Sequence, residues 1–304
     1  MITTNNKQTA VGNIAKASLN YMYVTKPRLL EQIKWALLRA LLSTVGRTSK
    51  GIQIGYTFGF DSGTMLDYVY ADEANGSLGV GKLIDRFYLN AVGWQAIRAR
   101  RNLLKRMLRA EVERNRAAGK PTRLLDVAAG PGRYLQELLQ ECSGEQEAGR
   151  NDLHILCRDL AIDGILQGAK QAEAAGLQTI HYEQGDAFNP APTDAHLGGA
   201  PNIIVVSGLY ELILEDETIQ QSLARLYQML APGGTLYFTT QTHHPQLEFI
   251  ANVLPNRNGT LWVMKCRPAA QLESWAYNAG FSQVQSQAEE VGLFTVTTAL
   301  KTIE

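Results

Sequence analysis

One short stretch places an acid, two glycines and a tyrosine in an order that suits ligand binding. It reads Leu124-Leu125-Asp126-Val127-Ala128-Ala129-Gly130-Pro131-Gly132-Arg133-Tyr134. The apolar start predicts a strand, and the two glycines predict a tight turn leading into a helix. Glycine lets the backbone approach a ligand closely, and the first turn of a helix offers free N–H groups. The stretch therefore predicts a nucleotide-type site, although dinucleotide folds share this signal.

Two further acids narrow the kind of ligand. Asp159, next to Leu160, follows the second apolar run, where a carboxylate can accept hydrogen bonds from both hydroxyls of a ribose. Asp186 follows the third run, and Ala187 and Phe188 come directly after it. A carboxylate there can accept a hydrogen bond from an adenine amino group while an apolar neighbour covers the ring. The pattern predicts an adenosine-binding site.

Strands that alternate with helices would position these residues. We expect a doubly wound, mostly parallel, seven-stranded α/β sheet, because such alternation is typical of parallel sheets, which bind ligands at the carboxyl ends of their strands. The predicted strands cover residues 123–128, 153–157, 179–183, 202–206, 235–240, 281–287 and 294–300. The predicted helices between them cover residues 132–142, 162–175, 217–230 and 269–279.

The first part of the chain differs in kind. We expect residues 1–120 to form a helical extension and residues 121–304 to form the sheet domain. The extension should contain helices over 27–45, opened by a proline, and 93–118. The stretch 51–70 between them is rich in glycine and aromatic residues, so it suits either a lid over a pocket or a packed connector.

Charge divides the chain in the same way. Residues 1–120 hold 19 lysines and arginines against 8 acids, and residues 121–304 hold 10 against 21, so the net charge is zero. Intramolecular pairing of the two parts is the simplest interpretation. The arginines and lysines of 98–109 would then be a mostly solvated helix face, with phosphate binding as the alternative. The apolar face of 27–45 should pack within the protein, with an interfacial membrane helix as the alternative.

The remaining composition favours a reducing compartment. The chain has three cysteines, Cys142, Cys157 and Cys266. They lack the spacing of a zinc site, and their small, odd number argues against a disulfide framework. Residues 1–10 are polar, without the apolar stretch of a signal peptide, and the longest apolar runs are too short to cross a bilayer. We expect a cytoplasmic protein with no metal site.

Together these motifs resemble the class I S-adenosylmethionine (SAM) methyltransferases. That family's first motif reads acid-x-Gly-x-Gly-x-Gly, and here it stands as Asp126-x-Ala128-x-Gly130-x-Gly132. Ala128 departs from the first glycine, and we expect its small methyl group to be tolerated. The resemblance, which covers residues 122–304, assigns Asp159 and Asp186 to the nucleoside of SAM and implies that Tyr134 reaches the methionine carboxylate.

The whole chain is also similar to a narrower group of bacterial methyltransferase-like proteins with a helical N-terminal extension. The shared signatures are Gly63-Thr64-Met65-Leu66-Asp67-Tyr68-Val69-Tyr70, Ser207-Gly208-Leu209-Tyr210-Glu211 and His244-Pro245-Gln246-Leu247-Glu248. It further resembles enzymes that cyclise SAM into azetidine-2-carboxylate, with release of methylthioadenosine. A closed lid would suit that chemistry as well as methyl transfer.

Residues beyond the fourth and fifth strands are the candidates for catalysis. Ser207, Tyr210, Glu211 and His243, or the adjacent His244, are expected there. A histidine could act as a base, and Tyr210 could face the sulfonium through a cation–π contact. Each has a structural alternative: a surface turn for the histidines, a helix N-terminus for Glu211 and the core for Tyr210.

The fourth strand also bears on the substrate. The Asn/Asp-Pro-Pro-Tyr signature of amine methylation in nucleic acids and proteins is absent, since Ser207-Gly208-Leu209-Tyr210 stands in its place. The sequence therefore predicts methyl transfer to a small molecule, with no nucleic-acid or membrane partner, and leaves the oligomeric state open. SAM cyclisation is the first alternative, and a lipid methyltransferase or a non-catalytic SAM-binding module is the second.

Overall fold

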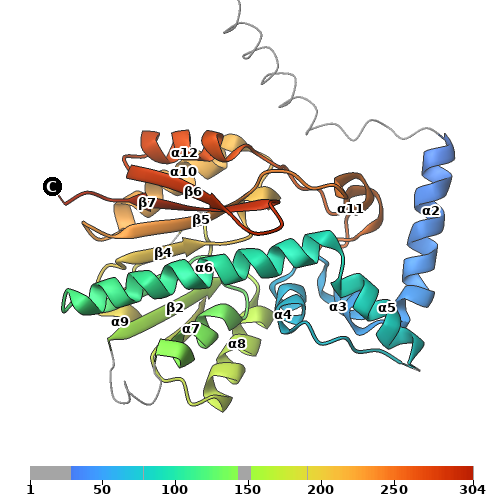
Figure 1. Cartoon of the computed structure of the whole chain (residues 1–304), viewed down its shortest axis with the longest axis horizontal. Helices are drawn as coiled ribbons and strands as arrows, with labels where there is room; N and C mark the ends of the chain where they lie inside the picture. Colours follow the sequence, from blue (N-terminus) through green and yellow to red (C-terminus); the bar gives the residue numbers. More distant parts are fainter. Residues whose placement is uncertain (1–28, 78, 143–151, 190, 304) are drawn as a thin grey trace, which may run out of the picture.

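A seven-stranded sheet forms the centre of the computed structural model, which describes residues 29–77, 79–142, 152–189 and 191–303. The strand order is β3-β2-β1-β4-β5-β7-β6, and the five strands from β3 to β5 run parallel (Figure 1). β7 is antiparallel to both of its neighbours. The strands are β1 (Thr122–Asp126), β2 (Leu153–Asp159), β3 (Ile180–Gln184), β4 (Ile203–Val206), β5 (Thr235–Gln241), β6 (Ser282–Ala288) and β7 (Phe294–Leu300). The predicted fold class is confirmed.

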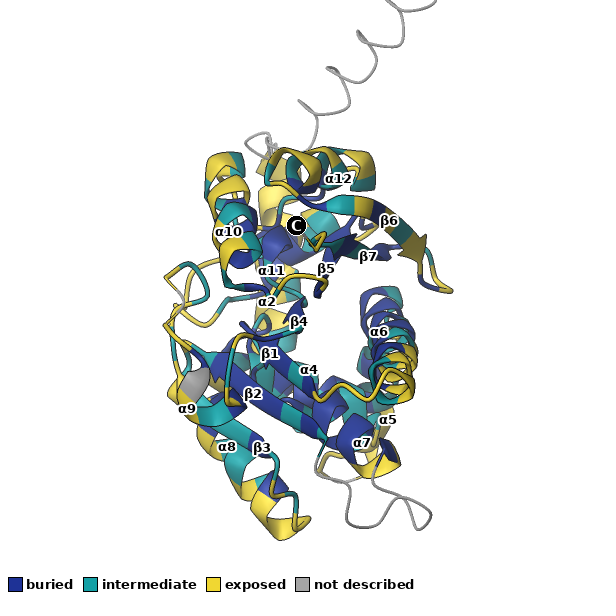
Figure 2. Cartoon of the chain, turned by 90° about the vertical axis from the view of Figure 1, so that its left-hand side faces the viewer, coloured by how far each residue is buried: buried dark blue, intermediate teal, exposed yellow. Residues whose placement is uncertain are grey.

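Helices cover both faces of the sheet, because the central strands are apolar on both sides. Leu124 packs with one layer, and its neighbour Leu125 packs with the other. The first layer comprises α6 (Val92–Ala117), α7 (Arg133–Cys142) and α8 (Ile162–Ala174). The second comprises α9 (Asp194–Leu197), α10 (Asp216–Met229) and α12 (Ala269–Asn278). The strands β1, β2, β4, β5 and β7 are mostly buried, whereas the edge strands β3 and β6 are more exposed (Figure 2).

A third apolar core lies at one end of the sheet, where the N-terminal helices gather (Figure 1). Its aromatic centre includes Phe60, Trp94 and Trp262. The elements around it are α2 (Leu29–Ser43), η1 (Val45–Thr48), α3 (Lys50–Phe58), α4 (Gly63–Ala71), α5 (Val80–Leu89) and α11 (Leu247–Val253). Of these, only α2 was predicted as an individual helix; η1, α3, α4, α5 and α11 were not. The expected opening proline at position 27 lies outside the described residues. Residues 143–151, which the sequence indicates to be an insertion before Asp159, also lie outside them.

The basic side of α6 is largely paired within the protein, which corrects the expectation of a solvated face. Arg101 lies 3.4 Å from Glu137 and Lys105 lies 2.7 Å from Glu141, both on α7. Arg100 is 1% exposed. The positive extension and the negative sheet domain therefore attract each other across this contact, as the opposite net charges predicted.

The apolar face of α2 is only partly covered, which corrects a second expectation. Trp35 is buried and Leu38 and Leu42 are partly buried against the third core. Leu30 and Leu37 are 80% and 65% exposed, respectively. The apolar stripe of α2 is therefore wider than the surface on which the helix packs. Within the described residues, no helix is both long enough and apolar enough to span a bilayer.

Candidate functional site

A pocket of about 350 Å³ opens where the strand order reverses between β1 and β4. We call it the strand-end pocket, and its floor is formed by the turns after β1, β2, β3 and β4. All ten residues that the sequence assigned to the cofactor line it: Asp126, Ala128, Gly130, Gly132, Tyr134, Asp159, Leu160, Asp186, Ala187 and Phe188. Parallel α/β sheets bind ligands at this reversal point, because the helices on its two sides diverge there.

Asp126 is the most deeply buried acid of the strand-end pocket, at 1% exposed. Its carboxylate accepts a hydrogen bond from the Tyr134 hydroxyl and one from the Ala128 N–H. Burial raises the pKa of Asp126 to about 7, even though the Tyr134 hydrogen bond acts to lower it. The Tyr134 hydroxyl thus holds Asp126 in place, and its use in that bond argues against the expected contact with a methionine carboxylate.

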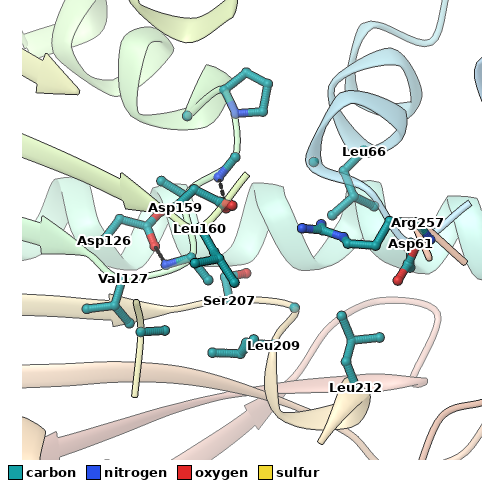
Figure 3. Close-up of a pocket in the computed structure, with 18 of the residues that line it drawn as sticks. Asp61, Leu66, Asp126, Val127, Asp159, Leu160, Ser207, Leu209, Leu212 and Arg257 are labelled. Atoms are coloured by element: carbon teal, nitrogen blue, oxygen red, sulfur yellow. Dashed lines mark hydrogen bonds between the residues drawn. The ribbon is translucent and has the colours of Figure 1, made fainter. Parts of the chain in front are cut away.

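Asp159 fixes the shape of the glycine turn. Its two carboxylate oxygens accept hydrogen bonds from the Gly130 and Ala161 N–H groups, each at 2.8 Å. Figure 3 shows the bond from Gly130. Each carboxylate offers about four acceptor positions, so Asp159 can still accept from a ligand hydroxyl. Gly130 and Gly132 adopt φ values of 53° and 65°, which residues other than glycine rarely adopt.

The N-terminal extension supplies the opposite wall of the strand-end pocket. In Figure 3, Leu66 and Asp61 face Asp126 and Asp159 across the space. Asp67 on α4 anchors this wall, because both of its carboxylate oxygens accept hydrogen bonds from Arg133 on α7, at 2.6 and 2.9 Å. Gln167 on α8 donates to the same carboxylate at 2.8 Å. The stretch 51–70 is thus folded as α3 and α4 against the pocket.

A second cavity of about 360 Å³ adjoins the first. We call it the helix-walled cavity, because residues from α2 to α6 and from α11 form most of its lining. Five residues line both spaces: Asp61, Leu66, Gly208, Leu212 and Trp262. The two cavities therefore meet at the ends of β4 and α4.

The predicted catalytic residues lie in different places in the structure. Ser207 lines the strand-end pocket, and Glu211 lines the helix-walled cavity, where it pairs with Arg100 at 3.2 Å. Tyr210 was expected to face the sulfonium, which is wrong: its ring is 1% exposed, packs in the second core and bonds Ser222. The turn after β4 points consecutive side chains in different directions, so Glu211 reaches the helix-walled cavity whereas its neighbour Tyr210 lines neither cavity.

His243 also corrects the prediction. Its side chain is exposed and borders neither cavity, whereas the adjacent His244 is buried and lines the helix-walled cavity. The Nδ1 atom of His244 accepts a hydrogen bond from the Gln246 N–H, so Nε2 carries the proton of the neutral ring. Burial lowers the pKa of His244 to about 4.

Sequence reasoning missed the residues that close the strand-end pocket from outside the sheet. Arg133 and the loop with Asn256, Arg257 and Asn258 line it. The Arg257 N–H donates to Asp61 at 2.7 Å, which joins that loop to the extension. The only signal for this contact was the turn-forming Asn-Arg-Asn-Gly order. Across the described parts of the chain, no three acids, histidines or cysteines gather where they could hold a metal ion.

The fold has parallels in known structures. A protein of Bordetella parapertussis, described as a "possible exported protein", matches with a TM-score of 0.66 and 17% identity, over 99% of this chain and 100% of its own. Magnesium protoporphyrin IX methyltransferase (ChlM) from Synechocystis PCC 6803, solved with bound S-adenosylhomocysteine, matches with a TM-score of 0.52 and 10% identity, over 88% and 99%. At these identities the likeness establishes the fold.

Sequence comparison reaches further. The uncharacterized protein YnbC of Escherichia coli K12 is 39% identical over 271 residues, which cover 88% of this chain and 45% of YnbC. This chain therefore spans less than half the length of that relative. A sequence profile of the family described as "Putative methyltransferase" matches residues 4–301. Because that profile and the fold agree over almost the entire chain, the protein belongs to this methyltransferase family.

Proposed function

We propose that this chain uses SAM to methylate a small-molecule acceptor. The observation that carries the proposal is the junction of the two cavities at Gly208 and Leu212. A methyl donor in the strand-end pocket and an acceptor in the helix-walled cavity would meet there, as an in-line displacement requires. The second cavity favours transfer over cyclisation, because an intramolecular reaction needs no room for another molecule.

The residues of the strand-end pocket fit SAM. Asp159 offers acceptor positions to ribose hydroxyls, and Asp186 is exposed and placed to accept from an adenine amino group beside Ala187 and Phe188. Gly130 and Gly132 have positive φ values that favour glycine, and a glycine turn lets a ligand approach the backbone closely. When bound, SAM supplies an electrophilic methyl group on a sulfonium. The chain's part is to orient the donor, exclude water and align the acceptor.

We assign different roles to the two parts of the chain. Residues 121–304 hold the donor, and the helices of the 1–120 extension wall the acceptor space. The small size of the helix-walled cavity favours a small molecule over a nucleic-acid or protein substrate, since a polymer would have to present one detached group through the junction.

Two measurements on the intact chain test this function. Calorimetry should detect SAM binding to the wild type, with binding at least tenfold weaker in Asp159→Ala and unchanged in Glu113→Ala, an exposed acid on α6. Mass spectrometry should then show intact SAM in the absence of an acceptor. Methylthioadenosine together with a new four-carbon amino acid would establish the cyclase instead, and absence of SAM binding would refute both reactions.

A further inference from the structure

The helix-walled cavity has an apolar body. The side chains that carry most of this character are Ile52, Tyr88, Trp94, Ile97, Trp262 and Phe294. Its volume of about 360 Å³ is more than twice the ~150 Å³ of a protein cavity that holds one benzene ring. A ligand of about two fused rings would therefore bury its surface against these walls.

The lining of this cavity includes a buried polar cluster, in which Arg100 also donates to the Tyr70 hydroxyl at 3.5 Å. Arg100 and Glu211 are 1% and 6% exposed and form an ion pair at 3.2 Å. Gln241 beside them is 2% exposed. Within the described chain, Arg100 Nε, Glu211 Oε2 and Gln241 Oε1 have no hydrogen-bond partner. Buried polar atoms are nearly always paired in folded proteins, so one donor and two acceptors here point to a polar ligand group.

The two charges of the ion pair cancel. Arg100 and Glu211 neutralise each other, and His244 is uncharged at neutral pH because burial lowers its pKa to about 4. Asp61 lies at the junction with the strand-end pocket, where its carboxyl accepts from the Arg257 N–H and burial raises its pKa. A charged ligand group beside the ion pair would be buried without a counterion, which is costly.

We infer, on the basis of the proposed function, that the helix-walled cavity binds an uncharged acceptor with an apolar ring body and a hydroxyl group, and that Glu211 Oε2 accepts the hydroxyl proton. A hydroxyl matches the unpartnered atoms, since it donates once, to Glu211, and accepts once, from Arg100 Nε. Gln241 Oε1 offers a second acceptor for a neighbouring protic group.

The position of Glu211 suits this role. Gly208 and Leu212, which flank it in the sequence, line both cavities. In the transfer step, the acceptor oxygen passes its proton to the Glu211 carboxylate and forms a bond to the methyl carbon. The methyl–sulfur bond breaks, and its electron pair stays on sulfur to give S-adenosylhomocysteine. The step removes the positive charge of the sulfonium and the negative charge of Glu211 together, so the total charge of the site does not change.

A set of naphthalene probes tests the inference on the intact chain in the presence of S-adenosylhomocysteine. We expect 2-naphthol to bind at least tenfold more tightly than naphthalene, which lacks the hydroxyl, and than 2-naphthoate, which carries a charge. With SAM, the wild type should form 2-methoxynaphthalene. Glu211→Gln should lower that rate at least 100-fold while changing SAM affinity less than twofold. Glu113→Gln, the exposed control on α6, should match the wild type in both.

A double variant keeps the test decisive if removal of one charge prevents folding. Replacing both ion-pair partners, Arg100→Met with Glu211→Leu, leaves no unpaired charge and is tolerated in buried sites of other proteins. It should retain naphthalene binding and lose the preference for 2-naphthol. An unchanged preference, or a wild type that binds SAM but neither binds nor methylates 2-naphthol, would overturn the inference alone. Failure of SAM binding would instead overturn the proposed function.

Discussion

Gly63, the first residue of α4, lies against Gly130 in the turn after β1, so closely that a Cβ atom on Gly63 would come within 2.8 Å of the Gly130 Cα atom. The helical extension therefore touches the backbone of the turn that forms the floor of the strand-end pocket. Since both contacting groups are backbone, neither can rotate away to make room. The shape of the pocket depends on this contact between segments 67 residues apart.

Substitution of Gly63 by alanine should weaken ligand binding more than stability. The added methyl group would push α4 away from Gly130, so we expect SAM affinity measured by calorimetry to fall at least fivefold. Gly46→Ala is a suitable control, because a Cβ atom there would make ordinary contacts of 3.4 Å or more. Equal SAM affinities in the two variants would show that α4 does not shape the pocket.

Removal of the Asp67 carboxylate should loosen the same wall. In Asp67→Asn the paired contact with Arg133 is lost, although Gln167 can still find a partner. We expect the free energy of unfolding to fall by about 2 kcal/mol, in line with the loss of a largely buried charged pair. Urea denaturation measures this. A change below about 0.5 kcal/mol would place the anchoring of α4 elsewhere.

The buried carboxyl of Asp126 should make stability fall as pH rises. The folded chain holds the Asp126 proton up to a pKa of about 7, whereas the unfolded chain releases it near 3.8. Between these values the folded state binds more protons, so the contribution of Asp126 declines by up to about 4 kcal/mol from pH 4 to pH 7. Urea unfolding of Asp126→Asn should lack this decline, while Asp186→Asn, at an exposed position, should retain it.

His244 should act in the opposite direction. Its pKa lies near 4 in the folded chain and near 6.5 in the unfolded chain, so the unfolded state binds more protons between these values. Stability should fall by about 3 kcal/mol as pH drops from 6.5 to 4. His244→Asn, whose side-chain oxygen can accept from the Gln246 N–H, should remove this fall. His243→Asn, on the exposed neighbour, should leave it intact, and equal effects of both variants would contradict the assignment.

Local patterns predicted which residues gather at the strand-end pocket. Asp126 and Asp159 end β1 and β2, and Asp186 follows β3. Parallel pairing brings strand ends to one edge whatever the details of packing. Ala128 does not adopt a positive φ, because the described non-glycine residues that do are Asp72 and Gln283. The expected tolerance of SAM binding to the Ala128 methyl group stays a prediction. The order of strands and acids along the sequence was enough to predict that these residues lie near one another.

The helix-walled cavity depends on contacts that sequence order does not encode. Which of His243 and His244 turns inward depends on the path of the chain after β5, and the side chain of Tyr210 is turned into the core by a single 3-10 turn. The Arg100–Glu211 pair joins residues 111 positions apart. Such pairings come from the docking of α6 on the sheet, so neither partner could be recognised alone.

The two cavities are also lined mostly by different segments of the chain. The strand-end pocket draws its floor from short turns after β1, β2, β3 and β4, whereas half of the residues that line the helix-walled cavity precede β1. Only the five shared residues belong to both. Substitutions in α3, α5 or the first turns of α6 can therefore reshape one space while the other keeps its dimensions, which allows relatives to diverge in the molecule they modify while retaining the same donor.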